Sequence, residues 1–334
     1  MMYALVLGGL ILLLFSGDLL VRGSVGLACK LGAPPLIIGL TVVAFGTSAP
    51  ELMISVNAAL AGSPGIAVGN VVGSNIANVL LVLGVPALIY AIACNQVGIR
   101  RNTFMMIGAT LLFIAFAQSG EFSRGNGIIM VILLAAFLIY SGWRAMTQND
   151  GEEAGLDDVE GIPSKPITTA GFIGAGLIGL PLGAHLLVTG ATDIARAFHV
   201  SDAVIGLTVV ALGTSLPELA TTVVAALRKR SDVAIGNVIG SNLFNILAII
   251  GITAIIKPLH VAPHFIEFDL WILLGISLLL VPFAMFHLSL SRLWGVTFVL
   301  GYVIYIAAVI VSGPQDTPAA PQANIPAPDV IHAG

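Results

Sequence analysis

Long apolar runs separated by short polar stretches cover most of the chain. A helix that spans the hydrocarbon core of a membrane needs roughly 20 apolar residues, and on that basis we predict about ten spans. They run approximately over residues 3–29, 35–61, 66–91, 103–117, 127–143, 169–198, 203–227, 233–256, 268–286 and 293–312. The pattern therefore predicts an all-α polytopic membrane protein.

Composition supports this class and excludes others. Hydrophobic residues make up 57% of the chain, charged residues only 9%, and the mean hydropathy is +1.04, whereas about a quarter of the residues in soluble domains are charged. The net charge of −4 comes with no basic patch, so nucleic-acid binding has no support. The two cysteines form no CxxC or Cys/His pattern, and we expect no disulfide framework, zinc site or resident cofactor.

A long segment occurs twice in the chain. Residues 39–84 align with residues 206–251 without a gap at a constant offset of 167, and 26 of the 46 positions are identical. Such similarity indicates an internal duplication. It divides the chain into a first half, 1–143, and a second half, 167–312, with five predicted spans each. An odd number of spans forces the second half into the membrane upside down, so we predict two inverted repeats.

The basic residues predict the orientation in the membrane. If the N-terminus is outside, ten of the thirteen lysines and arginines lie in or beside inner loops, as the positive-inside rule requires. Both termini are then on the non-cytoplasmic side. The segment 144–166 becomes an acidic cytoplasmic linker, which we interpret as solvated and which carries Glu152, Glu153, Asp157, Asp158 and Glu160. Residues 313–334 are rich in proline and alanine and are expected to be a disordered tail.

Each copy of the duplicated segment places a glutamate, Glu51 or Glu218, inside an apolar run, directly after a proline. A carboxylate at membrane depth costs several kcal/mol unless it faces a polar cavity or a partner. Neither apolar core contains a lysine or arginine, so the missing positive charge is expected to be a bound cation. Proline and glycine should also break the helix near residues 46–50 and free backbone carbonyls such as those of Ala44 and Ala211.

Hydroxyl and amide side chains accompany these glutamates. Thr47 and Ser48 can share a helix face with Glu51, and Ser74 lies one turn before Asn78. Such oxygen donors suit the hard cations Na⁺ and Ca²⁺. Ion ligation is favoured for Asn78 and its counterpart Asn245. For Asn75 and Asn242, ligation and interhelical hydrogen bonding both stay open.

Each repeat also contains a pair of closely spaced glycines, and one aligned position differs in charge between the repeats. The patterns 69–73 and 236–240 have glycine at both ends, and small residues at this spacing let helices pack closely. Asp18 aligns with His185, so this position breaks the symmetry between the halves. For both residues we favour a helix-end or packing role over a place along the ion pathway.

The motifs GTSAPEL…GNVVGSNIAN and GTSLPEL…GNVIGSNLFN resemble the two alpha-repeats of the calcium/cation antiporter superfamily, most closely its prokaryotic sodium/calcium exchanger branch. The resemblance covers nearly all of residues 1–312. It implies a ten-helix inverted-repeat fold in which the second, third, seventh and eighth helices form a cluster of ion sites. By motif position it implies these metal ligands: Glu51, Glu218, Asn78, Asn245, Thr47, Ser48, Thr214, Ser215, Ser74, Ser241, Ala44 and Ala211.

The function implied by this resemblance is a secondary antiporter that exchanges Na⁺ for Ca²⁺ by alternating access and extrudes calcium across the inner (plasma) membrane. Some relatives, including the potassium-dependent exchangers, carry aspartate at one of the two central positions. Here both are asparagine, Asn78 and Asn245, which argues against K⁺ co-transport. The expected partners are the transported cations and the lipid bilayer.

Three alternatives use the same residues. A Ca²⁺/H⁺ antiporter is the nearest, because a glutamate pair can carry protons as readily as Na⁺. An intramembrane hydrolase would pair Ser48 or Ser215 with His185, but it needs only one copy of the serine motif, and the histidine has no duplicate. A passive channel is opposed by deep paired carboxylates, whose tight binding would slow permeation.

Overall fold

The described residues form a bundle of helices. The structure is a computed structural model and describes residues 1–147, 161–163, 165–198 and 211–312. Its helices are α1 Met2–Leu31, α2 Pro35–Ile38, η1 Gly39–Val43, α3 Ala44–Thr47, α4 Ala49–Leu60, α5 Pro64–Ala77, η2 Asn78–Val82, α6 Gly84–Ile89, α7 Ile99–Ala117, α8 Arg124–Thr147, α9 Pro166–Ala197, α11 Ala211–Thr214, α12 Leu216–Leu227, α13 Ser231–Phe244, η5 Asn245–Ile250, α14 Gly251–Ile256, η6 Phe265–Asp269, α15 Leu270–Leu278, α16 Leu280–Phe286 and α17 Arg292–Ser312. The predicted all-α class is confirmed.

The spans agree closely with the predicted ones. Eight helical stretches in the described part are long and apolar enough to cross a membrane, and a ninth is broken, with a bend of 43° between Pro35–Thr47 and Ala49–Leu60. Of the predicted span 203–227, residues 203–210 lie outside the described residues. Helix α8 continues to Thr147 and α9 begins at Pro166, whereas the predicted spans end at residue 143 and begin at residue 169. The acidic linker residues and the tail lie outside the described residues.

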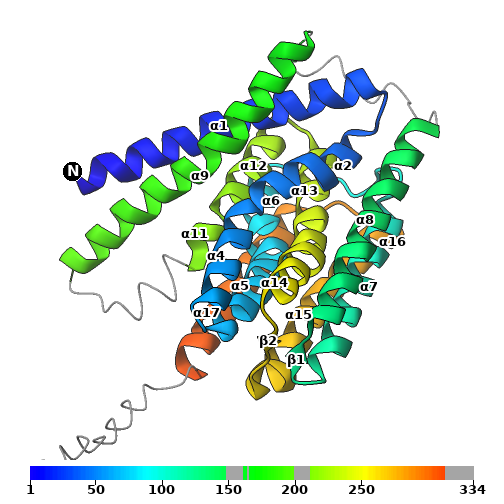
Figure 1. The fold of residues 1–334 in the computed structure, drawn as a ribbon. Helices are drawn as coiled ribbons and strands as arrows, with labels where there is room; N and C mark the ends of the chain where they lie inside the picture. The colour runs from blue at the N-terminus through cyan, green and yellow to red at the C-terminus, as the bar shows by residue number, and fades with distance from the viewer. Residues whose placement is uncertain (148–160, 164, 199–210, 313–334) are drawn as a thin grey trace, which may run out of the picture.

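Helices α1 and α9, which occupy the same place in the two repeats, lie side by side across the rest of the bundle (Figure 1). A Cβ atom built on Gly9 would lie 2.7 Å from the carbonyl oxygen of Gly183, and one on Gly23 would lie 2.8 Å from the Ile173 side chain. Contacts between the start of one helix and the end of the other mean that the pair is antiparallel. Equivalent helices therefore point in opposite directions, as inverted repeats require.

Contacts of the last helix of each half show the same inverted symmetry. Gly84 in α6 faces Phe298 in α17, and the equivalent Gly251 in α14 faces Met130 in α8. At one end of the molecule the backbone of Ile92 pairs with that of Leu290. The equivalent pair comes from the short antiparallel strands β1 Glu121–Phe122 and β2 Leu259–His260. The last helix of each half thus packs against the other half.

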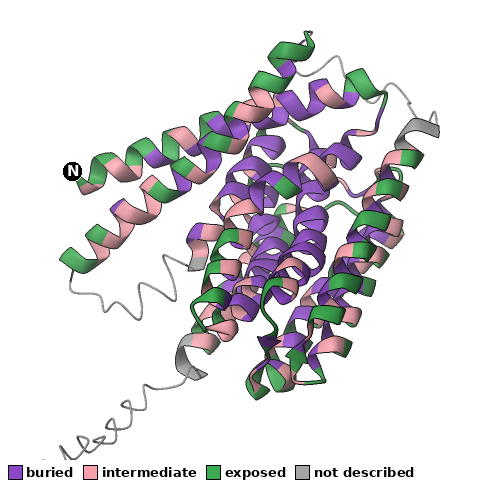
Figure 2. Ribbon diagram, viewed as in Figure 1, coloured by how far each residue is buried: buried purple, intermediate pink, exposed green. Residues whose placement is uncertain are grey.

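Burial separates a central cluster from an outer layer (Figure 2). Every residue from Val233 to Phe244 in α13 is buried. The outer helices instead expose large apolar side chains, such as Phe286 and Leu293, which are 72% and 74% exposed. In a chain with membrane spans these side chains face lipid, so the interior of the protein is the place where polar groups can meet one another.

In the described part of the chain, four π-helical segments interrupt the α-helices, and the sequence did not predict them. Two of them occupy equivalent places: η2 begins at Asn78 and η5 begins at Asn245. Apolar periodicity cannot distinguish a short π segment from the α-helix around it. Such segments are rare and frequently occur at functional sites.

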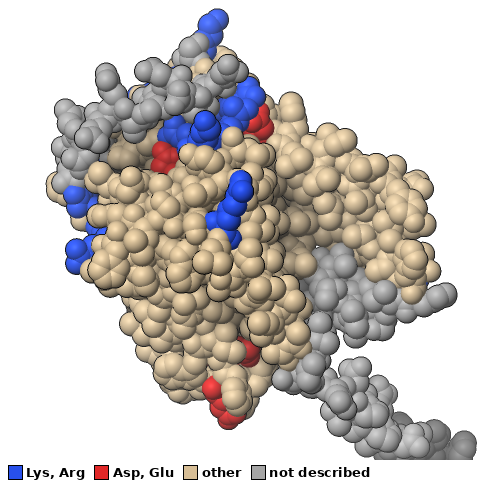
Figure 3. Space-filling model, turned by 180° about the vertical axis from the view of Figure 1, so that it is seen from behind, with Lys and Arg blue, Asp and Glu red and all other residues tan. Residues whose placement is uncertain are grey.

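Charged side chains are distributed unevenly over the surface (Figure 3). Lysine and arginine side chains gather toward the end of the molecule where α1 finishes and α9 begins, and the middle of this face has few charges. This polarity agrees with the positive-inside pattern used above. Which end faces the cytoplasm stays a prediction.

Candidate functional site

Both copies of the motif break their helix at the serine. Ser48 (φ −85°, ψ 3°) separates α3 from α4, and Ser215 (φ −87°, ψ 3°) separates α11 from α12. Proline occupies the first turn of the helix that follows, where its missing N–H group breaks no hydrogen bond. The predicted break at residues 46–50 is confirmed. It places Glu51 and Glu218 in the first turns of the new helices.

The two glutamates are buried, and a hydrogen bond joins the two copies of their motif. Their relative exposures are 1% for Glu51 and 0% for Glu218. The Ser48 hydroxyl donates a hydrogen bond to Oε1 of Glu218 at 3.2 Å. The sequence had placed Ser48 beside Glu51 on one helix face. The structure instead joins the hydroxyl of one repeat to the carboxylate of the other.

Four asparagines form two cross-repeat hydrogen bonds. Nδ2 of Asn78 donates to Oδ1 of Asn242 at 3.0 Å, and Nδ2 of Asn245 donates to Oδ1 of Asn75 at 3.1 Å. The two bonds are equivalent under the inverted symmetry. For Asn75 and Asn242, interhelical hydrogen bonding was one of the two open alternatives, and the structure contains it. Asn242 also donates to the sulfur of Met106 at 3.6 Å.

A set of buried oxygen atoms has no hydrogen-bond partner among the described residues. Within the motif they are both carboxylate oxygens of Glu51, Oε2 of Glu218, Oδ1 of Asn78 and Asn245, and Oγ of Ser215 and Ser241. A buried oxygen without a partner is costly, and a cation would satisfy several at once. Carboxylate, amide and hydroxyl oxygens fit Na⁺ and Ca²⁺. No group of three or more His, Cys, Asp or Glu side chains that could hold a metal ion occurs in the described part of the chain.

The carbonyl of Ala44 differs from its prediction. It accepts hydrogen bonds from the N–H of Ser48 at 3.0 Å and from the hydroxyl of Thr47 at 3.3 Å. The helix break therefore does not free this carbonyl, and its role as a ligand stays a prediction. In the other repeat the N–H of Ser215 donates to the carbonyl of Leu212 at 3.1 Å.

The remaining predicted ligands lie on the same elements. Oδ1 of Asn237, 3.4 Å from the Thr47 hydroxyl, is an alternative acceptor for its single proton. Ser74 lies on α5 and is 5% exposed. Ala211 and Thr214 form the two ends of α11, immediately before the break. As ligands, all of these residues stay predictions.

Sequence reasoning missed a second pair of asparagines that hold the glutamate-bearing turns. Nδ2 of Asn70 donates to the Glu51 carbonyl at 3.2 Å and to the Ser55 hydroxyl at 3.0 Å. Nδ2 of Asn237 makes the equivalent bonds to the Glu218 carbonyl at 3.4 Å and the Thr222 hydroxyl at 3.1 Å. Their recurrence at the same place in both motif copies was a signal that could have revealed them.

Close helix packing is confirmed for the glycines of the second repeat. A Cβ atom on Gly236 would lie 2.7 Å from the carbonyl oxygen of Leu36, and one on Gly240 would lie 2.6 Å from that of Leu40. Helix α13 therefore presses against the beginning of the broken span that carries Glu51. For Gly69 and Gly73 the equivalent partner positions, 203 and 207, lie outside the described residues.

The symmetry-breaking pair occupies different surroundings. Asp18 forms ion pairs with Arg22 and Arg228, which agrees with the packing role favoured for it. His185 is exposed on α9, whereas Ser48 and Ser215 are buried. A histidine on the outside of the bundle gives no support to the hydrolase alternative.

Comparison with known proteins matches the whole membrane part of the chain. The family described as sodium/calcium exchanger protein matches residues 1–143 and 168–311. The sodium/calcium exchanger MaX1 of Methanosarcina acetivorans is 32% identical over 92% of this chain and 98% of its own length. The inner membrane protein YrbG of Escherichia coli is 35% identical over 83% of this chain and 86% of its own length.

A solved structure gives the same result for the fold. It is that of the sodium–calcium exchanger NCX_Mj, soaked with 2.5 mM Na⁺ and 0.1 mM Ca²⁺. It superposes with a TM-score of 0.80 at 33% identity and covers 92% of this chain and 98% of that chain. Identity and fold agree over nearly the whole length of both proteins.

Proposed function

Because the chain belongs to the sodium/calcium exchanger family, a family of transporters and not of enzymes, we propose that this cation exchanger moves Ca²⁺ out of the cell in exchange for Na⁺. The hydrolase alternative is wrong for a member of this family. The observation that carries the proposal is the hydrogen bond from Ser48 of one repeat to the buried carboxylate of Glu218 in the other. Buried oxygens of Glu51, Asn78, Asn245, Ser215 and Ser241, which have no partner among the described residues, support it.

The charge of the site supplies the mechanism. Two carboxylates carry a charge of −2, which one Ca²⁺ or two Na⁺ balance. Binding either load neutralises the buried charge, and a neutral site crosses between inward-open and outward-open states at lower cost than a charged one. Competition for the same carboxylates then prevents both loads from binding together. Obligatory exchange follows from this competition.

The neutral side chains support Na⁺ as the coupling ion and argue against K⁺. The Ser48 hydroxyl contacts the Glu218 carboxylate, and Ser215 and Ser241 offer buried hydroxyl oxygens without a partner among the described residues. Na⁺ needs such additional oxygen ligands, whereas a proton does not. Both central positions, Asn78 and Asn245, are amides, and the aspartate found in potassium-dependent relatives has no counterpart here. The exchange is therefore proposed to be independent of K⁺.

Proton coupling is the second candidate. It is favoured by the carboxylate of Glu51, whose oxygens have no protein donor among the described residues, so that either oxygen could accept the single proton of the neutral acid. In that case the hydroxyl groups would serve Ca²⁺ alone. Calcium transport would then continue without sodium.

The protein is proposed to lie in the cytoplasmic membrane with both termini on its outer side. The support is the concentration of lysine and arginine at one end of the molecule (Figure 3), since basic residues favour the cytoplasmic side. The loop before α13 contributes Arg228, Lys229 and Arg230 to the ten basic residues predicted on the inner side. Accessibility of single cysteines placed at residues 2 and 229 to an impermeant thiol reagent in intact cells tests this orientation.

Uptake of ⁴⁵Ca²⁺ into proteoliposomes tests the function. Vesicles are loaded with Na⁺ or choline, or carry only a pH gradient, and external K⁺ is varied. We expect uptake to require internal Na⁺ and to be unaffected by K⁺. Uptake driven by the pH gradient alone would replace this proposal with proton exchange, and a steady calcium current without counter-ion would replace it with a channel.

A further inference from the structure

Two structural features lead to inferences beyond the set of ion ligands: the amide hydrogen bonds between the repeats, and an ion-pair cluster around Asp18. Both rest on the proposed function. We propose that Asn75 and Asn242 are positioning residues that act through the central asparagine of the opposite repeat. Each accepts a hydrogen bond from the amide N–H of that partner, Asn245 or Asn78, at 3.1 or 3.0 Å.

This bond decides which end of the partner amide is available. Because Nδ2 of Asn78 and of Asn245 is engaged, the other end of each amide, Oδ1, remains as a buried acceptor without a protein partner among the described residues. Without this hydrogen bond, the amide could rotate and turn its N–H group toward the bound cation. The partial positive charge of that N–H group repels a cation. Asn75 and Asn242 thus hold an oxygen in place without contributing it.

Double-mutant cycles on purified protein test this assignment, with Ca²⁺ affinity measured by isothermal titration calorimetry. We expect Asn75→Ala and Asn245→Ala each to weaken binding about tenfold, the value of one lost hydrogen bond to a charged group. The double variant should be no weaker than the single ones, because the residues act as one unit. Asn75→Ala combined with Asn78→Ala should multiply, since that pair shares no bond. Asn126→Ala, on α8, is the control and should bind normally.

Other outcomes separate the possibilities. If the Asn75 and Asn245 effects multiply, Asn75 is an independent ligand and the positioning role is wrong. If Asn75→Ala lowers the melting temperature without calcium but leaves affinity unchanged, its role is structural and the proposal is again wrong. If the native protein binds neither Ca²⁺ nor Na⁺, the proposed function itself fails.

The second observation is an ion-pair cluster that crosses between the α1–α9 pair and the central bundle. Asp18 in α1 accepts a hydrogen bond from Nε of Arg228, which follows α12, and pairs with Arg22 one turn along its own helix at 2.8 Å. All three side chains are 21–30% exposed. A Cβ atom built on Gly17, beside Asp18, would lie 3.4 Å from Ala220 and Val224 of α12.

The inverted repeat does not reproduce this cluster. The positions equivalent to Asp18 and Arg228 are His185 and Ala61, which cannot form an ion pair of this kind. In an alternating-access transporter built from inverted repeats, the opposite state is reached when α9 takes up against α4 the place that α1 has against α12. We infer that the Asp18–Arg228 pair is a latch that biases the resting protein toward the conformation described here.

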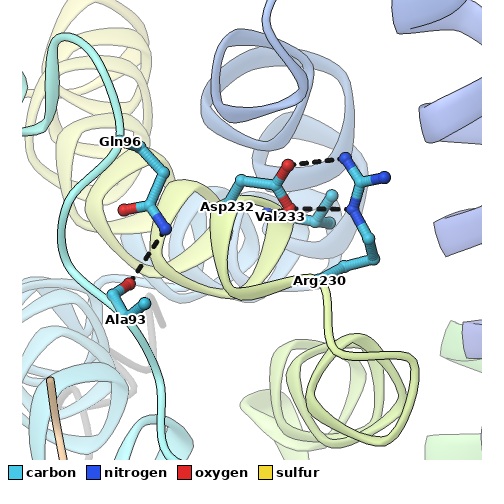
Figure 4. A network of polar contacts seen from close by, with 5 residues as sticks. All are labelled: Ala93, Gln96, Arg230, Asp232 and Val233. Atoms are coloured by element: carbon cyan, nitrogen blue, oxygen red, sulfur yellow. Dashed lines mark hydrogen bonds and ion pairs between the residues drawn. The ribbon is translucent and has the colours of Figure 1, made fainter. Parts of the chain in front are cut away.

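A neighbouring ion pair supplies a matched control. Arg230 and Asp232 form a two-pronged pair at 2.5 and 3.0 Å where α13 begins (Figure 4). Its two residues are only two positions apart in the chain, so this ion pair does not connect the α1–α9 pair to the central bundle. Asp232→Asn therefore removes a carboxylate, as Asp18→Asn does, but leaves the contact between α1 and α12 unchanged.

Thiol cross-linking reports the two conformations in a background of Cys29→Ser and Cys94→Ala. The pair Gly17→Cys with Val224→Cys reports the conformation described here, and the equivalent pair Ala184→Cys with Asn57→Cys reports the opposite one. We expect Asp18→Asn, and separately Arg228→Gln, to shift the ratio of the two cross-links about fivefold toward the second, the upper range for a partly exposed ion pair. Asp232→Asn should leave the ratio unchanged.

The native protein supplies the reference for this experiment. If Na⁺ and Ca²⁺ change the native cross-link ratio but neither Asp18→Asn nor Arg228→Gln does, the latch is wrong while alternating access stands. If no ion condition changes the native ratio, alternating access fails, and the latch fails with it. A shift in both latch variants and none in the control supports the inference.

Discussion

Replacing Glu51 with glutamine is expected to abolish calcium binding and to leave the ion-free protein folded. The substitution removes one of the two negative charges that balance Ca²⁺, and loss of one partner of a buried ionic contact costs about 3 kcal/mol or more, or at least about 100-fold in affinity. The carboxylate has no donor among the described side chains. A neutral amide of the same shape therefore relieves a buried charge in the ion-free state.

Thermal unfolding with and without calcium measures both parts of this prediction. For the native protein, calcium should raise the melting temperature, because a ligand that binds only the folded state stabilises it. For Glu51→Gln the ion-free melting temperature should be equal or higher, and the calcium-dependent rise should disappear. Glu218→Gln should also lose the calcium response, but it weakens the hydrogen bond from Ser48, so its ion-free melting temperature should be lower than that of Glu51→Gln.

An exposed glutamate provides the control for these variants. Glu121 lies in β1 and is exposed, and Glu121→Gln should keep both the native melting temperature and its rise with calcium. A calcium-dependent rise retained in both Glu51→Gln and Glu218→Gln would remove these carboxylates from the site. Retention in one of them alone would reduce the site to a single carboxylate and contradict the charge balance proposed for exchange.

The duplication was the most informative feature of the sequence for the fold. A gap-free offset of 167 between Glu51 and Glu218, with an odd number of spans between equivalent positions, is sufficient to predict inverted repeats, and the antiparallel contact of Gly9 with Gly183 agrees. The break at Ser48 was equally predictable, because Pro50 follows it and removes a backbone donor. These are local or periodic properties, which a sequence states directly.

Contacts between the repeats could not be predicted in the same way. Spacing within one helix places Ser48 near Glu51, and no feature of one segment shows that the hydroxyl will reach Glu218. The crossed amide bonds of Asn78 and Asn245 are hidden for the same reason. The carbonyl of Ala44 shows the converse limit: a proline predicts a freed acceptor, but the nearby Thr47 hydroxyl occupies it.

Gly240→Ala, in the glycine pair 236–240, is expected to destabilise the fold. A Cβ atom at this position would lie 2.6 Å from the Leu40 carbonyl oxygen and 2.7 Å from Cβ of Ala44. Backbone cannot yield as a flexible side chain can, so α13 must move away from the broken span. Overpacking of this kind costs about 1–3 kcal/mol, and the displaced helix carries Ser241, Asn242 and, at its end, Asn245.

The sign of this effect distinguishes packing from helix propensity. In a helix without close neighbours, alanine is favoured over glycine by about 1 kcal/mol, and Gly108 on α7 is exposed with no atom within 4 Å of a built Cβ among the described residues. Gly108→Ala should therefore raise the ion-free melting temperature slightly, while Gly240→Ala should lower it and weaken calcium binding. Equal effects at both positions would mean that α13 does not depend on close approach to Leu40. The expected divergence would show that the second glycine pair holds the amide-bearing helix against the span that carries Glu51, so that packing and ion affinity are lost together.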